Sequence, residues 1–465
     1  MKINLKIFLV GTLIAVLLIS LSFVGCKEKA APAEGVTEEV AEEEAAPTEE
    51  EAEEAETTAE ENIVITSLCT NLFVPAADTV LDSIVKEWAK SKGITAFSEH
   101  ISGDQLASKI SSELNMGSGH DIVEVEIGNS FIYGDLLSDV GSLVSEIEAQ
   151  SGNVLPVGKS MAYVDGVWRA VPFFHQSFPI LYRKDYCEAV GYDTEKMNSL
   201  TMDTFLDLAK KLAETGHMVG IPVSNTNDAK SILPPILWGF GGSLFGENNE
   251  ITVNSPETKK ALEYVAELCK YMPSEVTGWD SAANNLFMLS GEGAVTANPP
   301  SVYAAAISSK LDFADQLFCG PFPKGEFGSY RLTFAFNLAI PEYCTPIEKE
   351  LAADLIKYIL QRENFVNMTT AAQGYSQPLY EGLQNVPIWS ENPNLTGYEP
   401  AIEDNLFVNG WPGPLAYPTA YTVRADLEGI LPNMFSKVAS GEATPDEAMV
   451  WAQGELERIV REESE

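Results

Sequence analysis

The residue patterns that could support catalysis are incomplete in this chain. Its four histidines, His100, His120, His175 and His217, have no partner at the HExxH or HxH spacing of a zinc site. Neither a GxSxG nucleophile motif nor a Walker A phosphate loop is present. The 68 acidic residues could supply a glycosidase pair, but their number makes any single pair uninformative. We therefore expect no catalytic residue, no metal and no cofactor.

Residues suited to binding cluster between two extended runs. Asp165-Gly166 lies between β-prone residues, which predicts a hairpin. The strand that follows meets Val171-Pro172, where proline removes a hydrogen-bond donor, so we expect the chain to bend or change sheets there. Aromatic and hydrogen-bonding residues 173–176 precede a second extended run, 178–182. Such groups suit a place where the chain passes between two bodies.

Strands and helices alternate at the start of the folded part. We expect strands at 63–68, 94–97 and 122–126, a helix from Thr79 and another at 103–116. This alternation predicts βα units on a parallel or mixed sheet, which bind ligands at the carboxyl ends of their strands. The loops that contain Asn71 and Glu126 are therefore candidates for a cleft. For Glu124, Glu126 and Asp280, a solvated or hydrogen-bonded carboxylate is the alternative to ligand contact.

Three later helices have clear start signals. Thr201 is expected to cap a helix whose apolar stripe includes Phe205 and Leu212. Ser255 precedes Pro256 at the next helix start, and Thr444 is spaced from Glu447 as a capping box.

The order Asp-Gly, Val-Pro, aromatic and polar residues, then Leu181 to Asp185 resembles the first interdomain crossover of a known family. This family is the extracellular solute-binding proteins of sugar-binding ABC importers, which are similar to maltose-binding protein. The resemblance implies an α/β, two-lobed, type II periplasmic-binding-protein-like fold, with two mixed β-sheets flanked by helices and a hinge of crossover strands. It also implies lobes of residues 62–171 with 297–365, and 172–296 with 366–465.

Several further segments resemble this family in the expected order. The block 236–242 contains Trp238, for which core packing and a ligand contact both remain open. Residues 287–299 resemble a helix-to-strand return and imply a second hinge strand at 296–299, and 374–378 implies a third crossing. We expect Trp238, Tyr375 and Trp411 to stack on the ligand, and the other binding residues to be Asn71, Glu126, His175, Gln176, Asp280, Asn298 and Arg331, most of them through hydrogen bonds.

The first 61 residues read as targeting and spacer sequence. Residues 1–25 have a basic start and an apolar run, the layout of a signal peptide, and Gly25-Cys26 resembles a lipobox. We expect cleavage before Cys26 and a lipid on its sulfur; an ordinary secreted protein or a retained membrane anchor are the alternatives. Residues 26–61 contain a run rich in glutamate and alanine, which predicts a disordered acidic tether.

The charge of the chain limits its partners. Of the net charge of −39, residues 31–61 carry −14 and residues 1–30 carry +3, which leaves −28 on the folded part. Such a surface repels phosphate backbones and anionic membranes, so we expect no nucleic-acid partner and membrane contact only through the lipid. A neutral or cationic ligand fits better.

The cysteines predict no disulfide framework. Once Cys26 is assigned to lipid, five remain without CxxC or Cys/His metal spacing: Cys69, Cys187, Cys269, Cys319 and Cys344. We expect mostly buried, single cysteines that act as small apolar residues.

These observations favour a binding module over an enzyme. We expect a lipid-anchored, monomeric, extracytoplasmic protein that binds a small solute, most simply a sugar or oligosaccharide, and delivers it to an ABC permease with its ATPase. The alternatives are a binder of a cationic solute such as a polyamine or a peptide, and a lipid-anchored carbohydrate-active enzyme.

Overall fold

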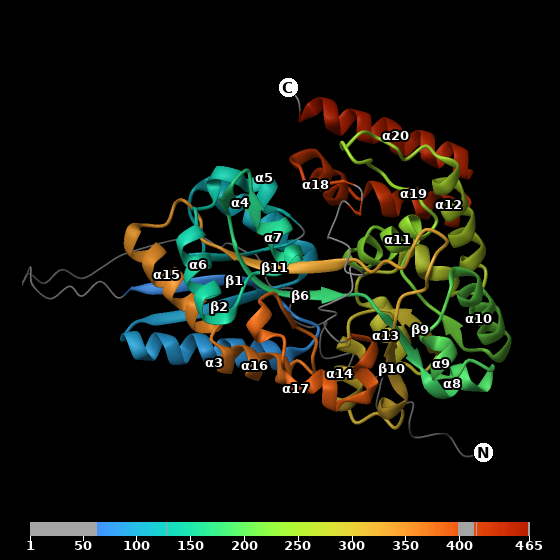
Figure 1. The fold of residues 1–465 in the computed structure, drawn as a ribbon, viewed down its shortest axis with the longest axis horizontal. Helices are drawn as coiled ribbons and strands as arrows, with labels where there is room; N and C mark the ends of the chain where they lie inside the picture. The colour runs from blue at the N-terminus through green and yellow to red at the C-terminus, as the bar shows by residue number, and fades with distance from the viewer. Residues whose placement is uncertain (1–62, 127, 399–412, 415, 464–465) are drawn as a thin grey trace, which may run out of the picture. The chain divides into compact units, whose positions relative to one another are not determined.

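The computed structural model describes residues 63–126, 128–398, 413–414 and 416–463. The first of its two main sheets has six strands, and its long strands β6 and β11 lie side by side (Figure 1). Its strand order is β12 (Gln377–Pro378), β6 (Val171–Ser177), β11 (Thr333–Ala339), β3 (Ile122–Glu126), β1 (Val64–Thr70) and β2 (Thr95–Ile101).

The first sheet is mixed, as the alternation of strands and helices predicted. Strand β1 is parallel to β2 and β3, whereas β11 is antiparallel to β3 and β6. Helix α3 (Pro75–Lys92) connects β1 to β2 and begins at Pro75, four residues before the expected start, because proline is well tolerated in the first turn. Its face of Leu81, Ile84 and Trp88 is buried, as expected for a helix packed on a sheet.

The second sheet has four strands and is also mixed. Its order is β10 (Leu317–Gly320), β7 (Ile180–Arg183), β9 (Gly293–Ala297) and β8 (Met218–Val219). Strand β7 is antiparallel to both neighbours, and β8 is parallel to β9.

The chain changes sheets at Val171-Pro172, as the sequence predicted: β5 (Val167–Trp168) belongs to a separate two-stranded sheet, and β6 of the first main sheet begins at Val171. Pro172 does not end β6, because the register shifts at a bulge beside its partner Asn337, and a bulge accommodates a residue without an N–H. The first change between the two main sheets comes after β6, at Phe178-Pro179, which is later than the predicted lobe boundary between residues 171 and 172.

The second and third crossings between the main sheets also lie later in the sequence than predicted. Strand β9 and then β10 stay in the second sheet, so the return lies between β10 and β11 rather than at residues 296–299. Strand β12 still pairs with β6 in the first sheet, and the chain leaves that sheet after it. That the lobes close as separate bodies stays a prediction.

The hairpin predicted at Asp165-Gly166 is present. Strands β4 (Tyr163–Val164) and β5 (Val167–Trp168) pair antiparallel around these two residues. Both have positive φ, 49° at Asp165 and 88° at Gly166, which is the geometry that makes Asp-Gly favourable in a two-residue turn.

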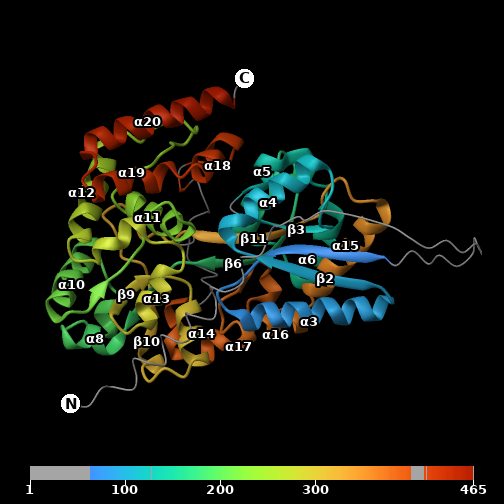
Figure 2. The same cartoon turned by 180° about the vertical axis from the view of Figure 1, so that it is seen from behind.

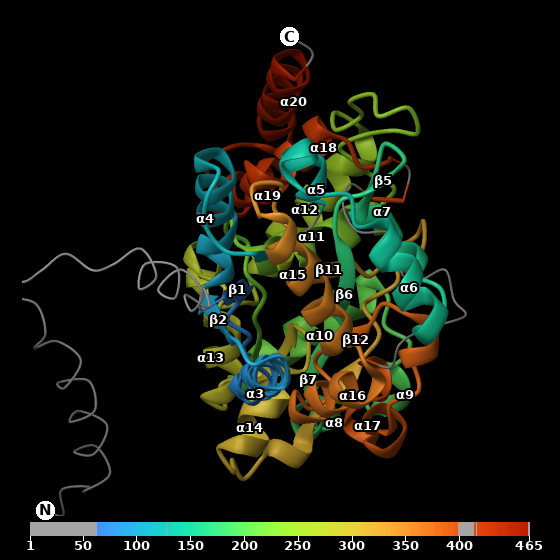
Figure 3. The ribbon, with the colours of Figure 1, turned by 90° about the vertical axis from the view of Figure 1, so that its left-hand side faces the viewer.

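Separate apolar cores stabilise the two sheets. Helix α3 packs with α16 (Arg362–Ala371) along the first sheet. On the second sheet, α18 (Ala420–Leu427), α19 (Ile430–Ala439) and α20 (Pro445–Glu462) pack together (Figures 1, 2 and 3). The remaining helices with buried side chains in the cores of the first sheet are α4 (Gly103–Met116), α5 (Ser130–Tyr133), α6 (Gly141–Ser151), α7 (Pro156–Ala162) and α15 (Pro346–Ile359).

The helices in the cores of the second sheet include the C-terminal end of the chain. They are α8 (Lys184–Ala189), α9 (Thr194–Met197), α10 (Met202–Thr215), α11 (Asn227–Gly239), α12 (Pro256–Cys269), α13 (Ala283–Leu289), α14 (Ser301–Ser308), α17 (Pro387–Glu391), α18 (Ala420–Leu427), α19 (Ile430–Ala439) and α20 (Pro445–Glu462). None of the described helices is both long and apolar enough to cross a membrane.

The predicted helix starts are confirmed. Thr201, Ser255 and Thr444 each accept a hydrogen bond from the backbone N–H three residues later. Thr444 and Glu447 form the reciprocal capping box.

The cysteine prediction is also confirmed where the structure describes the chain. All five cysteines from Cys69 to Cys344 are unpaired, and all except Cys269 are buried. Burial raises the pKa of the Cys187, Cys269 and Cys319 thiols, which keeps them protonated and unreactive.

Candidate functional site

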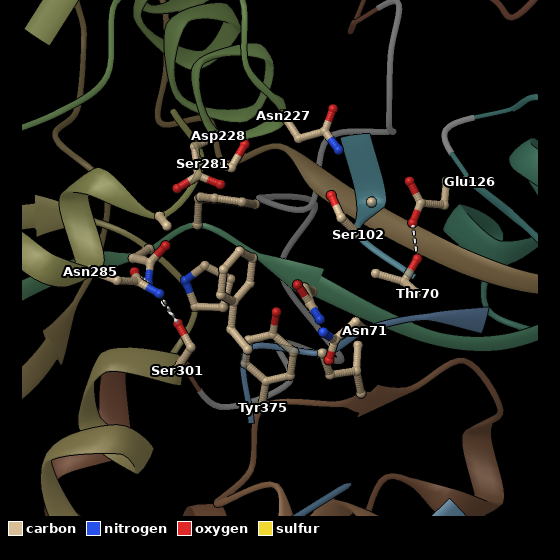
Figure 4. A pocket seen from close by; sticks show the side chains of 18 of the residues that line it. Thr70, Asn71, Ser102, Glu126, Asn227, Asp228, Ser281, Asn285, Ser301 and Tyr375 are labelled. Atoms are coloured by element: carbon tan, nitrogen blue, oxygen red, sulfur yellow. Dashed lines mark hydrogen bonds between the residues drawn. The ribbon is translucent and has the colours of Figure 1, made fainter. Parts of the chain in front are cut away.

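A cavity of about 290 Å³ receives side chains from the elements of both sheets (Figure 4). The first sheet and its loops contribute Thr70, Asn71, Phe73, Glu126, Gln176 and Tyr375. Elements of the second sheet contribute Asn227, Asp228, Asp280, Asn285, Asn298 and Ser301. Since β1 and β3 are parallel and both end here, the cavity has the position expected for a ligand site of an α/β sheet.

Carboxylate groups accept hydrogen bonds from the end of β1 and from the loop that follows it. The backbone N–H of Thr70 donates to Glu124 Oε1 at 3.0 Å, and its hydroxyl donates to Glu126 Oε1 at 2.7 Å (Figure 4). Further along, the backbone N–H of Leu72 donates to Asp78 Oδ2 at 3.2 Å. These bonds fix the backbone that presents Asn71 and Phe73 to the cavity.

Burial makes two of these carboxyl groups weaker acids than usual. The pKa of Glu124 is raised to about 8, mainly because the side chain is buried and also because Glu126 lies close. Burial likewise raises the pKa of Asp78 to about 6, while the nearby His100 opposes the rise. Near neutral pH, Glu124 is therefore largely protonated.

The pKa of Glu124 makes stability depend on pH. A carboxyl with a raised pKa in the folded state contributes stability below its unfolded pKa, near 4.5, and loses it as the pH rises through about 8. We expect the unfolding free energy of the unmodified protein to fall relative to Glu124→Gln between pH 5 and 8, by up to ~1.4 kcal/mol per pH unit. Urea denaturation at several pH values measures this difference, with the exposed Glu350→Gln as control. Parallel curves for the protein and Glu124→Gln would contradict the assignment.

The opposite wall of the cavity is a network of amides and hydroxyls. Asn284 Nδ2 donates to Asp228 Oδ2 at 2.7 Å. Asn298 Nδ2 donates to Asn285 Oδ1 and to Ser301 Oγ, both at 2.8 Å. Because these side chains fix one another, the polar groups of this wall are preorganised for a ligand.

Aromatic rings provide the apolar surface of the cavity. Phe178, Phe336 and Tyr375 line it and are buried, whereas Phe73 also lines it and remains 45% exposed. The pKa of the Tyr375 hydroxyl is raised by burial and by the negative charges of Asp228, Asp78 and Glu126, and the adjacent Gln176 amide opposes this rise. Aromatic faces beside hydrogen-bonding groups suit a small solute that has both C–H faces and hydroxyls.

A second cavity, of about 480 Å³, continues from the first. The two share four lining residues, Gly103, Glu126, Asn227 and Asp280. The second is also lined by Asn129, Lys230, Trp279 and Asp426. Together they form one cleft, which we call the ligand cleft.

A possible metal-binding group lies elsewhere. Among the described residues, Asp121, Cys344 and Glu348 offer ligand atoms within 4.8 Å of one another, but none lines the ligand cleft. Asp121 Oδ2 already accepts from the Thr66 backbone at 2.7 Å, and Glu348 Oε2 accepts from the Thr345 backbone at 2.7 Å. These hydrogen bonds give the carboxylates of Asp121 and Glu348 a structural role in the fold.

Comparison with known proteins places this geometry in a family. Residues 83–397, more than half of the chain, match the family described as bacterial extracellular solute-binding protein. The chain belongs to this family. Solute-binding proteins of this family work outside the cytoplasm, which assigns this one an extracytoplasmic location.

Individual relatives are consistent with this family, and the solved structures among them show the fold. A Deinococcus radiodurans protein named "Probable ABC transporter-binding protein" is 24% identical over 286 residues, which span 58% of this chain and 66% of that protein. Maltose-bound MalE3 of T. maritima is 21% identical, with a TM-score of 0.75 over 85% of this chain and 99% of that one. A solute-binding protein of Thermotoga lettingae bound to α-D-tagatose is 19% identical, with a TM-score of 0.73 over the same shares. The fold of this solute-binding protein is therefore the predicted two-lobed, type II periplasmic-binding-protein fold.

Six of the residues predicted to bind ligand meet in the ligand cleft. They are Asn71, Glu126, Gln176, Asp280, Asn298 and Tyr375. Their convergence follows from the crossover of β6 and from the ends of β1, β3 and β9. That each contacts the solute stays a prediction.

Three other predicted residues do not line the cleft. His175 lies beside Gln176 on β6, and strand alternation points the two side chains to opposite faces. Burial and the charge of Arg331 lower the pKa of His175 to about 3.

Trp238 and Arg331 make contacts outside the ligand cleft. Trp238 is buried and meets Tyr330 edge-on, with ring centroids 6.1 Å apart, so the core-packing alternative describes its position. Arg331 Nη1 donates to the Gly397 carbonyl at 2.8 Å. Trp411 lies outside the described residues.

The sequence prediction missed several residues of the cleft. Phe73 lies two residues after Asn71 in the same loop, so the rule that ligands bind after parallel strands could have found it. Asp228 lies in the first turn of α11, whose N-cap is Thr226. No local signal brings Asp228 beside Asn298, because that proximity depends on packing between distant segments.

Proposed function

We propose that this solute-binding protein captures a sugar or oligosaccharide in the ligand cleft and delivers it to an ABC permease with its ATPase. The observation that carries the proposal is one cleft in which aromatic rings lie beside carboxylate, amide and hydroxyl groups from both sheets. Rings such as Phe73 and Tyr375 offer faces on which sugar C–H groups stack, and the polar side chains can pair with hydroxyls. The two solved relatives described above, which hold maltose and tagatose, support the same class of ligand.

The two-sheet construction suggests how capture proceeds. Ligand contacts from both sheets favour a closed arrangement by the difference in affinity between the open and closed states. The backbone at Phe178-Pro179, between β10 and β11 and after β12 would absorb the hinge motion, since the chain changes sheets there. The protein would act as a monomer, without cofactor and without chemical change of the solute.

A ligand screen tests the sugar assignment. Residues 62–465 are mixed with mono- and oligosaccharides, polyols and polyamines, and the melting temperature is measured. We expect at least one sugar to raise it, with saturable heat in titration calorimetry. A rise with polyamines alone would refute a sugar ligand, and sustained turnover heat would identify an enzyme.

The proposed anchor is tested at Cys26. If a lipid is attached to its sulfur, Cys26→Ser should move the protein from the membrane fraction to the soluble fraction of an expressing bacterium. Fractionation and labelling with a radioactive fatty acid measure this change, and Cys269→Ser is the control. An unchanged distribution would leave a retained membrane anchor as the better explanation.

A further inference from the structure

The two parts of the ligand cleft meet at carboxylates from both sheets. Glu126 ends β3 of the first sheet, whereas Asp280 belongs to the segment that precedes α13 beside the second sheet. Both line both cavities, so we call this pair the acidic junction. Asp228 adds a third carboxylate to the first cavity, from the wall across from Glu126 (Figure 4).

The described lining has little positive charge to balance these groups. No lysine, arginine or histidine is among the described residues that line the first cavity. Lys230 lines the second, but its Nζ lies 4.0 Å from Asp426 Oδ2, and both side chains are largely buried. Asp426 therefore offsets the charge of Lys230, and the acidic junction keeps an excess of negative charge.

A buried acceptor also faces this end of the cleft. Asn129 lines the second cavity, is 6% exposed, and its Oδ1 has no hydrogen-bond partner in the described structure. A buried acceptor without a partner costs free energy unless a ligand donates to it. This end of the cleft thus combines an acceptor without a hydrogen-bond partner with little positive charge among the described lining residues.

These two features, the acceptor without a partner and the excess of negative charge, indicate the chemistry of the ligand. A sugar hydroxyl can donate one hydrogen bond but brings no positive charge to the carboxylates when the cleft excludes water. A protonated amine supplies up to three donors and a positive charge, which offsets the cost of removing the carboxylates from water. The neighbouring rings also favour a cation near their faces.

We propose that the solute of this cleft is a sugar that carries a protonated amine, held at the acidic junction of Glu126 and Asp280. The inference rests on the proposed sugar-binding function and narrows its substrate class. The amine would place positive charge between the carboxylates contributed by the two sheets, so it would favour closure more than a neutral sugar does.

Matched ligands test the inference. Titration calorimetry at pH 7 compares sugars that bear a free amine with the same sugars bearing an N-acetyl or a hydroxyl group, such as the glucosamine disaccharide, its N,N′-diacetyl form and cellobiose. We expect the best amine-bearing sugar to bind at least ~10-fold more tightly than its neutral counterparts. This advantage should shrink as the salt concentration rises from 0.05 to 0.5 M.

Two variants localise the effect. Asp280→Asn removes an exposed carboxylate of the junction and should reduce the ratio of amine-sugar to neutral-sugar affinity several-fold. Glu350→Gln, an exposed position on α15 outside the cleft, removes the same charge and should leave both affinities unchanged.

The outcomes separate this inference from the proposed function. Binding of neutral sugars with equal or greater affinity, or an unchanged ratio in Asp280→Asn, overturns the amine and leaves sugar binding in place. Binding of spermidine but of no sugar overturns the sugar and keeps the ammonium at the junction. Binding of none of these ligands overturns both.

Discussion

Replacing Phe73 with alanine is expected to weaken binding of the preferred sugar by about 10- to 100-fold, while the melting temperature of the free protein hardly changes. Phe73 lines the ligand cleft and is 45% exposed without ligand. Its ring can therefore stack on a sugar face while contributing little to the core, and the loss of one aromatic anchor costs roughly 1.4–2.8 kcal/mol of binding. Titration calorimetry with the best ligand of the screen measures the effect.

Phe97 provides a matched control for this experiment. It is 47% exposed on β2 and does not line either part of the cleft, so Phe97→Ala removes a ring of similar exposure from a different surface. Its affinity for the sugar should remain within about twofold of the unmodified protein. Equal affinity of Phe73→Ala and Phe97→Ala would exclude Phe73 as a stacking residue.

Replacing Phe174 with alanine is expected to destabilise the fold by about 3–5 kcal/mol, the usual cost of removing a buried aromatic ring. Phe174 lies on β6, is 1% exposed and stacks on Phe336 with ring centroids 4.4 Å apart. It also meets Phe173 edge-on at 4.8 Å. The cavity left in the core would disturb the ligand cleft, because Phe336 lines the cleft.

Denaturation in urea and calorimetry together measure this second effect. The unfolding free energy should fall by the stated amount, and the affinity for the sugar should fall with it because Phe336 loses its packing partner. Phe97→Ala again serves as control and should cost less than about 1 kcal/mol. A loss of stability for Phe174→Ala no larger than that of Phe97→Ala would contradict the packing assigned to the crossover.

Local patterns were sufficient for most of the secondary structure. The Asp165-Gly166 turn, the capping threonines at 201 and 444, and the buried stripe of α3 are confirmed because each depends on interactions within a few residues. The change of sheets at Val171-Pro172, predicted from the proline, is present, whereas the crossings between the two main sheets lie later than the resemblance implied. Whether a proline ends a strand depends on its neighbour, and here the bulge beside Asn337 keeps Pro172 within β6.

The sequence also predicted part of the lining of the cleft, because strand ends can be located from local patterns. Asn71, Glu126 and Asn298 lie close to strand ends, and strand ends meet in an α/β fold. His175 does not line the cleft, because the register of β6 places Gln176 on the cleft side and His175 on the other. Trp238 suited a sugar face by its chemistry, but packing against Tyr330 decided its place.

The sequence by itself determined the class of this protein: its alternating strands and helices, its acidic charge, its crossover motif and the absence of a complete catalytic motif. Only the tertiary structure decided which polar groups share a cleft, since Glu126, Asp228 and Asp280 are separated by many residues and come together through the packing of two sheets. The physical reason is that hydrogen-bonded turns and helix caps are local, whereas the charge balance of a binding site is the sum of side chains from distant segments.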